Sequence, residues 1–465
     1  MPRTLGMAGS RRKAAEQLSI IQQWRGTVGF AKRKALPIST ALLVLSVALV
    51  VAVVPTAGAA PPPVFYVAPT GSDSAGNGTI SSPFATISHA VARATSGSTV
   101  IVEPGTYREM VLVATKITLI SQSSQPSNTI IDATGLPVGI AILGSAAAGT
   151  VIEGFTVQNA NNEGIYVQDS SNVIIENNVA SNNGLNVIKG LGEVKAIELT
   201  GTSDSTVAGN NVEWNKFGGR GVADDGPNNP SMNATAVPSA GFPVSKALPA
   251  NGNVISGNLV ANNRPHHCAI VVSASNAGMG VWNNIVSGNT VVDDQSGIIV
   301  AADTPNTFAV NNTVIGNQIL NLGEAGVVVH SNAPGDVVKD NSIVGNLISY
   351  SGSGPKMAGI LVGGEDMDAA VAVQNTLISG NTFHDEYVGI QIVNAKQTLV
   401  GGNTMDSTVK LPVNGTVTTI SSPSATPVTS TGIPLLALPT AIGTLIVGLI
   451  AGMIVSPFHK RRETV

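Results

Sequence analysis

Residues 254–258 read Val-Ile-Ser-Gly-Asn, and variants of this phrase return throughout the middle of the chain. Each phrase ends on an asparagine, and successive asparagines are 28 to 48 residues apart. The series consists of Asn178, Asn210, Asn258, Asn289, Asn317, Asn346 and Asn381. A period of this length is typical of a solenoid, in which each repeat is one structural unit stacked on its neighbours.

A second phrase follows in most repeats and reads Gly297-Ile-Ile-Val, with equivalents that begin at Gly164, Gly326, Gly359 and Gly389. Both phrases are rich in β-branched residues and bounded by Gly, Asn, Ser and Asp, which favours short strands and tight turns. Strands stacked about 4.8 Å apart align Val and Ile in continuous apolar columns. The sequence therefore predicts an all-β parallel β-helix of about ten coils over residues 61–410.

The repeated asparagines have a structural explanation. Asparagine tolerates the left-handed backbone of a tight turn. In stacked coils its amide can also donate a hydrogen bond to the asparagine of the next coil. We therefore expect the seven asparagines to form one internal column without a chemical role.

Composition supports a narrow core and limits the function. The chain is 43% hydrophobic but only 4% aromatic and 11% charged, and it contains 51 glycines. A net charge of −4 argues against nucleic-acid binding. Cys268 is the single cysteine, which excludes an intramolecular disulfide framework.

The two ends of the chain predict a membrane protein. Residues 1–34 form a basic leader, and residues 35–60 contain an apolar stretch that fits either a cleaved signal peptide or a signal anchor. Residues 411–432 are a Ser/Thr/Pro-rich linker, 433–455 a second apolar span, and 456–465 a basic tail. The positive-inside rule places both basic flanks in the cytoplasm and the repeats outside the cytoplasmic membrane.

The region before the repeats has its own signature. Phe65-Tyr-Val-Ala-Pro leads through a polar loop to residues 86–94, Thr-Ile-Ser-His-Ala-Val-Ala-Arg-Ala, and then to Pro104-Gly-Thr-Tyr-Arg-Glu. Residues 86–94 read as a short helix with Ile87 and Val91 on one face, which can cover the open end of a solenoid. With the repeats, these residues resemble the pectate-lyase-like right-handed parallel β-helix superfamily. The resemblance implies a right-handed solenoid with an N-terminal helical cap, and leaves the activity open.

A narrower resemblance concerns two short segments. Some secreted β-helix proteins carry a Thr-Asp-Glu-x-Gly-Pro turn followed about a coil later by Asp-Cys-Gly-Ile. This chain has Asp224-Asp225-Gly-Pro and His267-Cys268-Ala-Ile, so His replaces Asp and Ala replaces Gly. No activity follows from this match.

Candidate site residues emerge when the coils are aligned on the Gly-Ile-x-Val phrase. One column then contains Asp225, Asp303 and Glu365, and a neighbouring column contains His330. The turn before the phrase carries His266 and His267 in one coil. We expect these acids and imidazoles on one side wall, with Asp303, His330 and Glu365 as substrate-binding candidates.

The strongest candidate site is at Asp224 and Asp225, which directly precede the long insertion 228–250. Paired carboxylates could hold Ca²⁺ through oxygen ligands. In a lyase, a base removes the proton alpha to a uronate carboxylate, and the catalytic candidates are Asp224, Asp225, His266, His267, Lys216 and Arg220. Each also has a structural explanation, since Asp-Asp-Gly-Pro is a common turn and histidines are often solvated.

Three functions remain open at this point. The protein could bind cell-envelope or environmental polysaccharide at the membrane, act as a lyase or epimerase on an acidic glycan, or serve as a structural or adhesive spacer. A clustered Asp/His/Lys wall favours the enzyme, and a Ser/Thr/Asn wall favours binding or structure. Exposed aromatic residues for stacking on sugars are scattered in the sequence, which weakens the lyase interpretation.

Overall fold

The computed structural model describes residues 60–185, 195–216, 220–225, 248–263, 268–275, 278–352, 357–363 and 373–419, with the backbone alone for 220–225. The chain divides between Pro61 and Pro62, and the helices and strands below belong to the unit that begins at Pro62.

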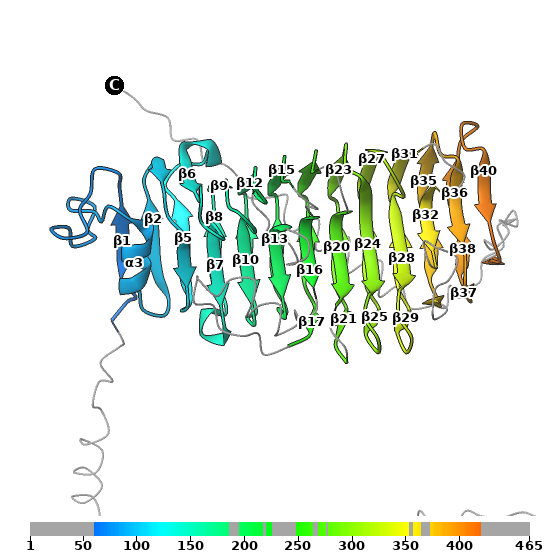
Figure 1. The fold of residues 1–465 in the computed structure, drawn as a ribbon, viewed down its shortest axis with the longest axis horizontal. Helices are drawn as coiled ribbons and strands as arrows, with labels where there is room; N and C mark the ends of the chain where they lie inside the picture. The colour runs from blue at the N-terminus through cyan, green and yellow to red at the C-terminus, as the bar shows by residue number, and fades with distance from the viewer. Residues whose placement is uncertain are drawn as a thin grey trace, which may run out of the picture. The chain divides into compact units, whose positions relative to one another are not determined.

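The strands of this unit stack in four parallel sheets that run along one axis (Figure 1). The first sheet has 13 strands, namely β1 (Val64–Val67), β2 (Ser98–Val102), β5 (Ile117–Ser121), β8 (Val151–Glu153), β11 (Ile174–Glu176), β14 (Thr206–Ala208), β18 (Val254–Ser256), β22 (Ile285–Ser287), β26 (Thr313–Ile315), β30 (Ser342–Val344), β34 (Leu377–Ser379), β38 (Leu399–Gly401) and β41 (Thr418–Thr419). The second sheet has 11 strands, namely β4 (Val111–Val113), β7 (Ile140–Leu143), β10 (Ile165–Gln168), β13 (Lys195–Thr200), β16 (Arg220–Asp225), β20 (Cys268–Ala274), β24 (Ser296–Ala302), β28 (Val327–Ser331), β32 (Ala358–Val362), β36 (Val388–Ile392) and β40 (Leu411–Asn414).

The third sheet also has 11 strands, namely β3 (Gly105–Tyr107), β6 (Thr129–Asp132), β9 (Thr156–Gln158), β12 (Val179–Ser181), β15 (Asn211–Glu213), β19 (Leu259–Ala261), β23 (Thr290–Val292), β27 (Gln318–Leu322), β31 (Leu347–Ser351), β35 (Thr382–His384) and β39 (Thr404–Met405). The fourth sheet is confined to the later coils and comprises β17 (Ala250–Asn251), β21 (Gly280–Trp282), β25 (Phe308–Val310), β29 (Val337–Lys339), β33 (Val373–Gln374) and β37 (Ala395–Lys396).

Each coil visits the second, first and third sheets in turn, and a later coil such as β20–β21–β22–β23 also visits the fourth. Strands of one sheet pair in parallel with their equivalents in the neighbouring coils, as β22 does with β18 and β26. This arrangement confirms the predicted parallel β-helix.

One continuous apolar core fills the solenoid from Val67 to Val409. In a three-residue strand such as β22 only the central residue, Val286, is fully buried. Each coil therefore contributes small branched side chains to the interior, which explains how a chain with few aromatic residues builds this core.

The predicted asparagine column is confirmed. It follows the strands of the first sheet, and each amide Nδ2 donates to Oδ1 of the next asparagine at 2.9 to 3.1 Å. The column runs through Asn178, Asn210, Asn258, Asn289, Asn317, Asn346 and Asn381, and continues to Asn403. The same amides donate to backbone carbonyls of the preceding coil, so these turns are satisfied internally.

A short helix, α3 (Ile87–Arg93), covers the N-terminal end of the solenoid (Figure 1). Ile87 and Val91 belong to the same apolar core as the first strands, as the sequence predicts. Thr86 caps the helix by accepting a hydrogen bond from the backbone N–H of His89. Glu109 adds a contribution that sequence reasoning missed, because its carboxylate accepts hydrogen bonds from the first two N–H groups of the helix.

The two 3₁₀ turns, η1 (Pro126–Asn128) and η2 (Ser145–Ala147), lie in early coils. At the other end, β40 and β41 extend the solenoid to residue 419, past the predicted boundary at 410. Leu411-Pro-Val-Asn pairs in register with β36, so it is a strand and not a linker. The described residues include no helix long and apolar enough to cross a membrane, and the predicted spans at 35–54 and 433–455 lie outside the described residues.

Candidate functional site: an axial groove between two aromatic residues

The turn at the end of most third-sheet strands has a repeated backbone conformation, which in β27 and β31 falls on the second-to-last residue of the strand, Asn321 and Tyr350. In eight successive coils one residue of this turn has a positive φ, between 54° and 63°. These residues are Asn159, Asn182, Trp214, Asn262, Asp293, Asn321, Tyr350 and Asp385. Asn and Asp tolerate this left-handed conformation, whereas bulky side chains rarely adopt it.

A second asparagine column lies immediately behind this turn and was not predicted. Asn183 donates to Asn215, Asn215 to Asn263, and Asn263 to Asp294, at 3.1, 2.9 and 3.2 Å respectively. Each of these buried residues directly follows a left-handed turn residue. The column therefore fixes the backbone on which the turn residues are presented to solvent.

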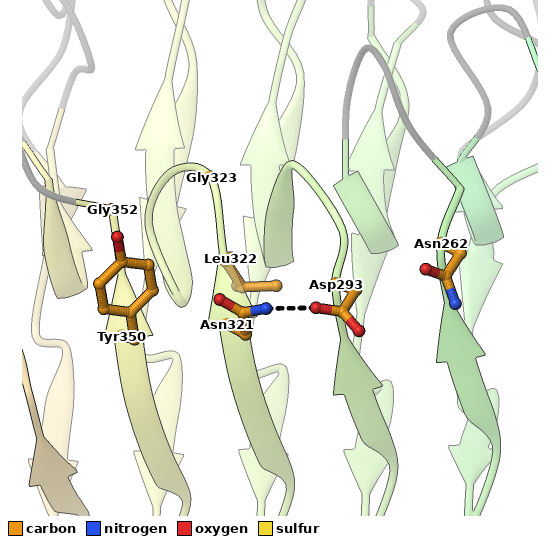
Figure 2. Close-up of a pocket in the computed structure, with 7 residues that line it drawn as sticks. All are labelled: Asn262, Asp293, Asn321, Leu322, Gly323, Tyr350 and Gly352. Carbon is orange, nitrogen blue, oxygen red and sulfur yellow. Dashed lines mark hydrogen bonds between the residues drawn. The ribbon is translucent and has the colours of Figure 1, made fainter.

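The turn residues border two adjoining hollows that together form the axial groove. The first, of about 370 Å³, is lined by Asn182, Trp214, Asn215, Lys216 and Asn262. The second, of about 500 Å³, is lined by Asn262, Asp293, Asn321, Leu322, Gly323, Tyr350 and Gly352 (Figure 2). Asn262 belongs to both, so the groove continues across the coils between Trp214 and Tyr350.

Trp214 and Tyr350 are the aromatic residues among the described residues that line this groove. Their exposed fractions are 55% and 45%, so neither ring is held by the core. Figure 2 shows the Tyr350 ring beside the polar side chains of Asn321 and Asp293, across successive strands. Trp214 and Tyr350 are four coils apart, or about 19 Å at a stacking distance of about 4.8 Å.

The floor of the groove between the rings is polar. Asn321 donates a hydrogen bond from Nδ2 to Oδ1 of Asp293 (Figure 2). Among the described lining residues Asp293 is the acid and Lys216, beside Trp214, is the base. Rigid aromatic faces together with amide and carboxylate groups are suited to a ligand that has both C–H faces and hydroxyl groups.

The outer face of the second sheet, where the sequence places the side wall, is largely shielded from water. Val271, Ala301 and Val328 face outward, are almost fully buried and form an apolar cluster separate from the core. All residues of β20 and β24 are buried. The side wall on which the sequence places these acids and imidazoles therefore includes a buried apolar surface.

In the preceding coils the same face carries a buried ionic group. Lys195 Nζ lies 3.1 Å from Oε1 of Glu198, and Thr200 Oγ1 donates to the same carboxylate at 2.7 Å. Burial, together with the charge of Glu198, raises the pKa of Glu163 to about 8. A buried ion pair of this kind loses much of its Coulombic gain to desolvation, so its presence is weak evidence that it stabilises the fold.

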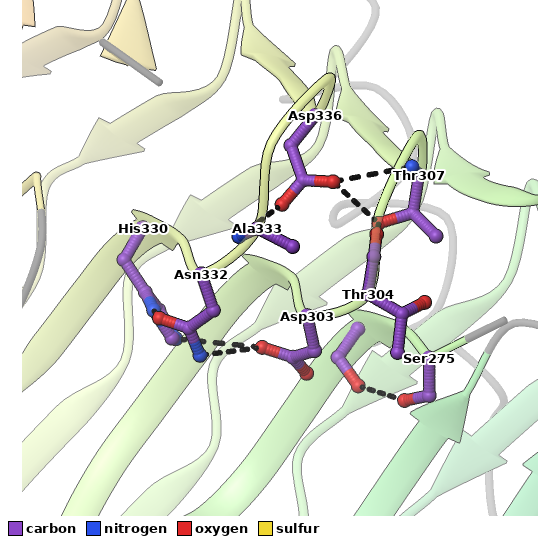
Figure 3. A network of polar contacts seen from close by, with 9 residues as sticks. Ser275, Asp303, Thr304, Thr307, His330, Asn332, Ala333 and Asp336 are labelled. Atoms are coloured by element: carbon purple, nitrogen blue, oxygen red, sulfur yellow. Dashed lines mark hydrogen bonds and ion pairs between the residues drawn. The ribbon is translucent and has the colours of Figure 1, made fainter. Parts of the chain in front are cut away.

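The structure brings Asp303 and His330 together, as the sequence predicts. His330 Nε2 lies 3.9 Å from Asp303 Oδ1, and Asn332 donates to the same oxygen at 3.2 Å (Figure 3). Asn332 Oδ1 lies 2.9 Å from His330 Nδ1. His330 is largely buried, so this network links neighbouring coils at the end of β24 and β28 (Figure 3).

The alignment of Asp225 with Asp303 needs correction. Asp225 pairs with Thr200 and Ser273 and therefore lies in the column of His330, not that of Asp303. The chain offers two glycines, Gly219 and Gly221, for the alignment. Because Val222 pairs with Ile197, the coil uses Gly221, and the strand moves by two residues relative to the prediction.

The main predicted site is described only in part. Asp224 and Asp225 end β16, and Arg220 begins it, so Arg220 and Asp225 are about 16 Å apart along the strand. Lys216 precedes this strand and borders the axial groove instead. The side chains of 220–225, and the whole of His266, His267 and Glu365, lie outside the described residues, so the predicted site stays a prediction.

The described residues provide no support for a metal site. No group of three or more His, Cys, Asp or Glu side chains that the structure describes could hold a metal ion. The Ca²⁺ expected at Asp224 and Asp225 has no support among the described residues and stays a prediction, because the side chains of this pair lie outside them.

Two family models match parts of the chain. The model described as "Right handed beta helix region" matches residues 138–314, and "Periplasmic copper-binding protein (NosD)" matches residues 246–422. Copper sites use imidazole and sulfur ligands, and the described residues offer no such cluster, so they do not fit a copper site. No curated protein matches the chain significantly.

Several solved structures are similar. The pectate lyase Pel9A has 15% identity and a TM-score of 0.49, covering 77% of this chain and 82% of its own. A family 28 exopolygalacturonase of Yersinia enterocolitica has 12% identity and a TM-score of 0.46, covering 77% and 78%. PfbA, a surface adhesin of Streptococcus pneumoniae, has 12% identity and a TM-score of 0.42, covering 71% and 87%.

At these identities and TM-scores no activity follows for this chain. The stacked parallel sheets, the internal asparagine columns and the two family models agree on the architecture. The chain belongs to the right-handed parallel β-helix superfamily.

Proposed function

We propose that this protein binds polysaccharide outside the cytoplasm and that the axial groove is its binding surface. The observation that carries the proposal is the placement of Trp214 and Tyr350. Both are exposed, both have a left-handed backbone, and both border a polar groove. A left-handed backbone at a residue other than glycine costs about 1–3 kcal/mol, so this conformation at Trp214 and Tyr350 does not favour the fold itself.

Sugar binding explains why the two aromatic residues occur in this column. A pyranose ring has an apolar C–H face that packs on an aromatic ring, and hydroxyl groups at its edge. Asn262, Asp293 and Asn321 offer hydrogen-bonding groups between the rings. An extracytoplasmic location is supported by the basic flanks of the two apolar spans and by the matched family described as periplasmic.

The test is binding of purified full-length protein to an array of polysaccharides and defined oligosaccharides. We expect the parent to bind at least one glycan and the variants Trp214→Ala and Tyr350→Ala to lose at least about tenfold in affinity, or 1.4 kcal/mol. The control is Val337→Ala, an exposed apolar residue of the fourth sheet outside the groove. Equal binding by all four proteins, or no binding by the parent, would reject the proposal.

The alternative of a lyase or epimerase stays a prediction that rests on Asp224 and Asp225. It is tested by product formation from acidic polysaccharides, with Asp224→Ala and Asp225→Ala combined. Turnover that this double variant abolishes and Trp214→Ala preserves would assign catalysis to the second sheet and not to the axial groove.

A further inference from the structure

We infer that Ser349, His384 and Asp406 form a hydrolytic site for carboxylic esters, with acyl groups on the polysaccharide of the axial groove as its substrate. The choice of a polysaccharide ester rests on the proposed function, whereas the chemistry rests on these three side chains. Two observations carry the inference: the order of the three residues along one face of the third sheet, and the ring nitrogen of His384 that Asp406 binds.

The three residues lie in successive coils on the outer face of the third sheet. Ser349 pairs in register with His384, across the strands β31 and β35 (Figure 1). Each of the two follows a fully buried residue, Ile348 or Phe383, so both side chains point outward. Asp406 continues this row, because its backbone N–H donates to the Phe383 carbonyl at 3.4 Å. Neighbouring residues of the row are therefore about 4.8 Å apart.

Asp406 holds His384 by one ring nitrogen. Nδ1 of His384 lies 2.5 Å from Oδ2 of Asp406, and Oδ1 accepts hydrogen bonds from the backbone N–H and the hydroxyl of Thr408. The hydrogen bonds from His384 and Thr408 lower the pKa of the Asp406 carboxyl to about 2, so at neutral pH this group is an ionised acceptor. Nδ1 therefore carries the proton of the neutral imidazole, and Nε2 keeps its lone pair.

This lone pair gives His384 the properties of a general base. The two ring nitrogens point away from one another, so Nε2 is turned away from the coil that carries Asp406. Ser349 occupies the paired position in the coil on the other side, where its hydroxyl can donate to Nε2. Serine, imidazole and carboxylate in this order, with the carboxylate on Nδ1, is the arrangement that activates a serine nucleophile on unrelated folds.

The reaction that this arrangement supports is ester hydrolysis in two steps. Ser349 Oγ attacks the ester carbonyl carbon while His384 Nε2 takes the hydroxyl proton, and Nε2 then gives this proton to the departing sugar oxygen. A solvent water attacks the resulting acyl-serine and passes one proton to Nε2. His384 returns that proton to Ser349 Oγ as the carboxylic acid leaves. Asp406 stays ionised throughout and acts as a positioning residue.

The position of Ser349 connects this chemistry to the axial groove. Ser349 directly precedes Tyr350, which borders the groove (Figure 2). A sugar chain that continues past Tyr350 along the axis next meets the coil of His384. The side chain of His384 is 40% exposed, so esters on such a chain and small esters in solution both have access to it.

The chain provides a matched control for the serine. Ser181 occupies the same row of the third sheet in an earlier coil, but its partner in the next coil is Glu213 and not a histidine. Ser349→Ala and Ser181→Ala each remove one outward hydroxyl. His384→Ala removes the base, and Asp406→Asn keeps the shape of the positioning residue without its charge.

The measurement is hydrolysis of p-nitrophenyl acetate by the full-length parent and these four variants, together with labelling by a fluorophosphonate, which reacts with activated serines. We expect the parent to hydrolyse the ester and to carry the label on Ser349 in peptide mass spectrometry. Ser349→Ala and His384→Ala should lower kcat/KM at least about 100-fold, and His384→Ala should also prevent labelling of Ser349. Asp406→Asn should lower kcat at least about tenfold with KM unchanged, and Ser181→Ala should match the parent.

Acetate release from O-acetylated xylan and O-acetylated pectin tests the substrate class. We expect the parent to release acetate from at least one of them, and Trp214→Ala to slow this release about tenfold, in line with the expected loss of glycan affinity. Hydrolysis of p-nitrophenyl acetate without acetate release from either polysaccharide would reject the glycan ester as the substrate.

Two results would overturn the inference while glycan binding by the groove stands: a parent that neither hydrolyses p-nitrophenyl acetate nor reacts with the fluorophosphonate, or equal activity of the parent and Ser349→Ala. Failure of the proposed function looks different. In that case hydrolysis of p-nitrophenyl acetate still depends on Ser349, but Trp214→Ala changes neither glycan binding nor acetate release.

Discussion

Trp214 and Tyr350 occupy the same turn position four coils apart, with φ angles of 60° and 59°. In the coils between them this position holds Asn262, Asp293 and Asn321, which tolerate a left-handed backbone. The two aromatic residues are thus the least suited to their own backbone. Strain of this kind persists where the side chain has another role.

The first prediction follows from that strain. Replacing Trp214 by Asn should raise the free energy of unfolding by about 1 kcal/mol, because the left-handed backbone is relieved and an exposed ring loses little burial. The same substitution should weaken glycan binding at least tenfold. Urea unfolding and glycan binding measured on the same samples test both effects.

Asn262→Ala is the control for this prediction, since it places a less suitable side chain at the equivalent turn and should lower stability. A Trp214→Asn variant that is markedly less stable than the parent would show that the ring is a structural element. The proposed binding role would then lose its main support.

Chain length provides a second prediction. If the sugar chain lies along the axis, oligosaccharides must cover about 19 Å to reach both Trp214 and Tyr350. Affinity should therefore rise steeply between the di- and the pentasaccharide of the bound series. Tyr350→Ala and Trp214→Ala should each remove this rise, leaving all lengths with similar dissociation constants in calorimetry. A smooth increase that neither substitution affects would contradict axial binding.

The architecture could be predicted because the sequence repeats with the period of the structural coils. Asn258 and Asn289 carry the same short-range signal in consecutive repeats, and stacking makes that local signal a global one. The cap could be predicted because Ile87 and Val91 lie on one face of a short helix, which is a local signal. The exact register of β16 could not, because Gly219 and Gly221 give two alignments that only long-range pairing distinguishes.

The groove could not be predicted because its signal depends on backbone geometry. Trp214 and Tyr350 are far apart in sequence, and each looks like a scattered aromatic residue. Only the column of positive φ angles shows that they share one position. A usable signal was present, however, since Trp214-Asn215 and Tyr350-Ser351 align with Asn262-Asn263 once the second asparagine column is recognised.

The third prediction concerns the first asparagine column. Asn289 donates to Asn317 Oδ1 at 2.9 Å and to the Ile255 carbonyl at 3.0 Å, while its Oδ1 accepts from Asn258. Asn289→Ala leaves several buried polar groups without partners. We expect a loss of about 2–5 kcal/mol in the free energy of unfolding.

The matched control for Asn289 is Asn311, which also stacks on an asparagine of the neighbouring coil, Asn283, but in solvent. Asn311→Gly should cost less than about 1 kcal/mol, because glycine adopts the positive φ of 56° at this position without strain and water replaces the lost hydrogen bond. Chemical denaturation of both variants measures the difference. Similar losses would mean that burial adds little to the asparagine column.

The final prediction concerns Glu386, whose carboxylate accepts hydrogen bonds from the backbone N–H and the hydroxyl of Ser351 in the preceding coil. Burial raises the pKa of Glu386 to about 7 from an ordinary value of 4.5. The folded state therefore holds this proton to a higher pH than the unfolded state. Protonated Glu386 therefore contributes on the order of 3 kcal/mol to the free energy of unfolding below pH 4.5, and this contribution is lost as the pH rises to 7.

Glu386→Gln should therefore flatten the decline of unfolding free energy between pH 4.5 and 7 and make the protein more stable than the parent at pH 8. The contribution of Glu163 to the free energy of unfolding declines over an overlapping pH range, because burial raises its pKa to about 8. The quantity to measure is therefore the difference in unfolding free energy between the parent and Glu386→Gln at each pH. Asp340→Asn, at an exposed position, should leave the profile unchanged. Parallel profiles for parent and Glu386→Gln would show that the pKa of Glu386 is not raised in the folded state, which would contradict the effect of burial, the largest cause of the shift.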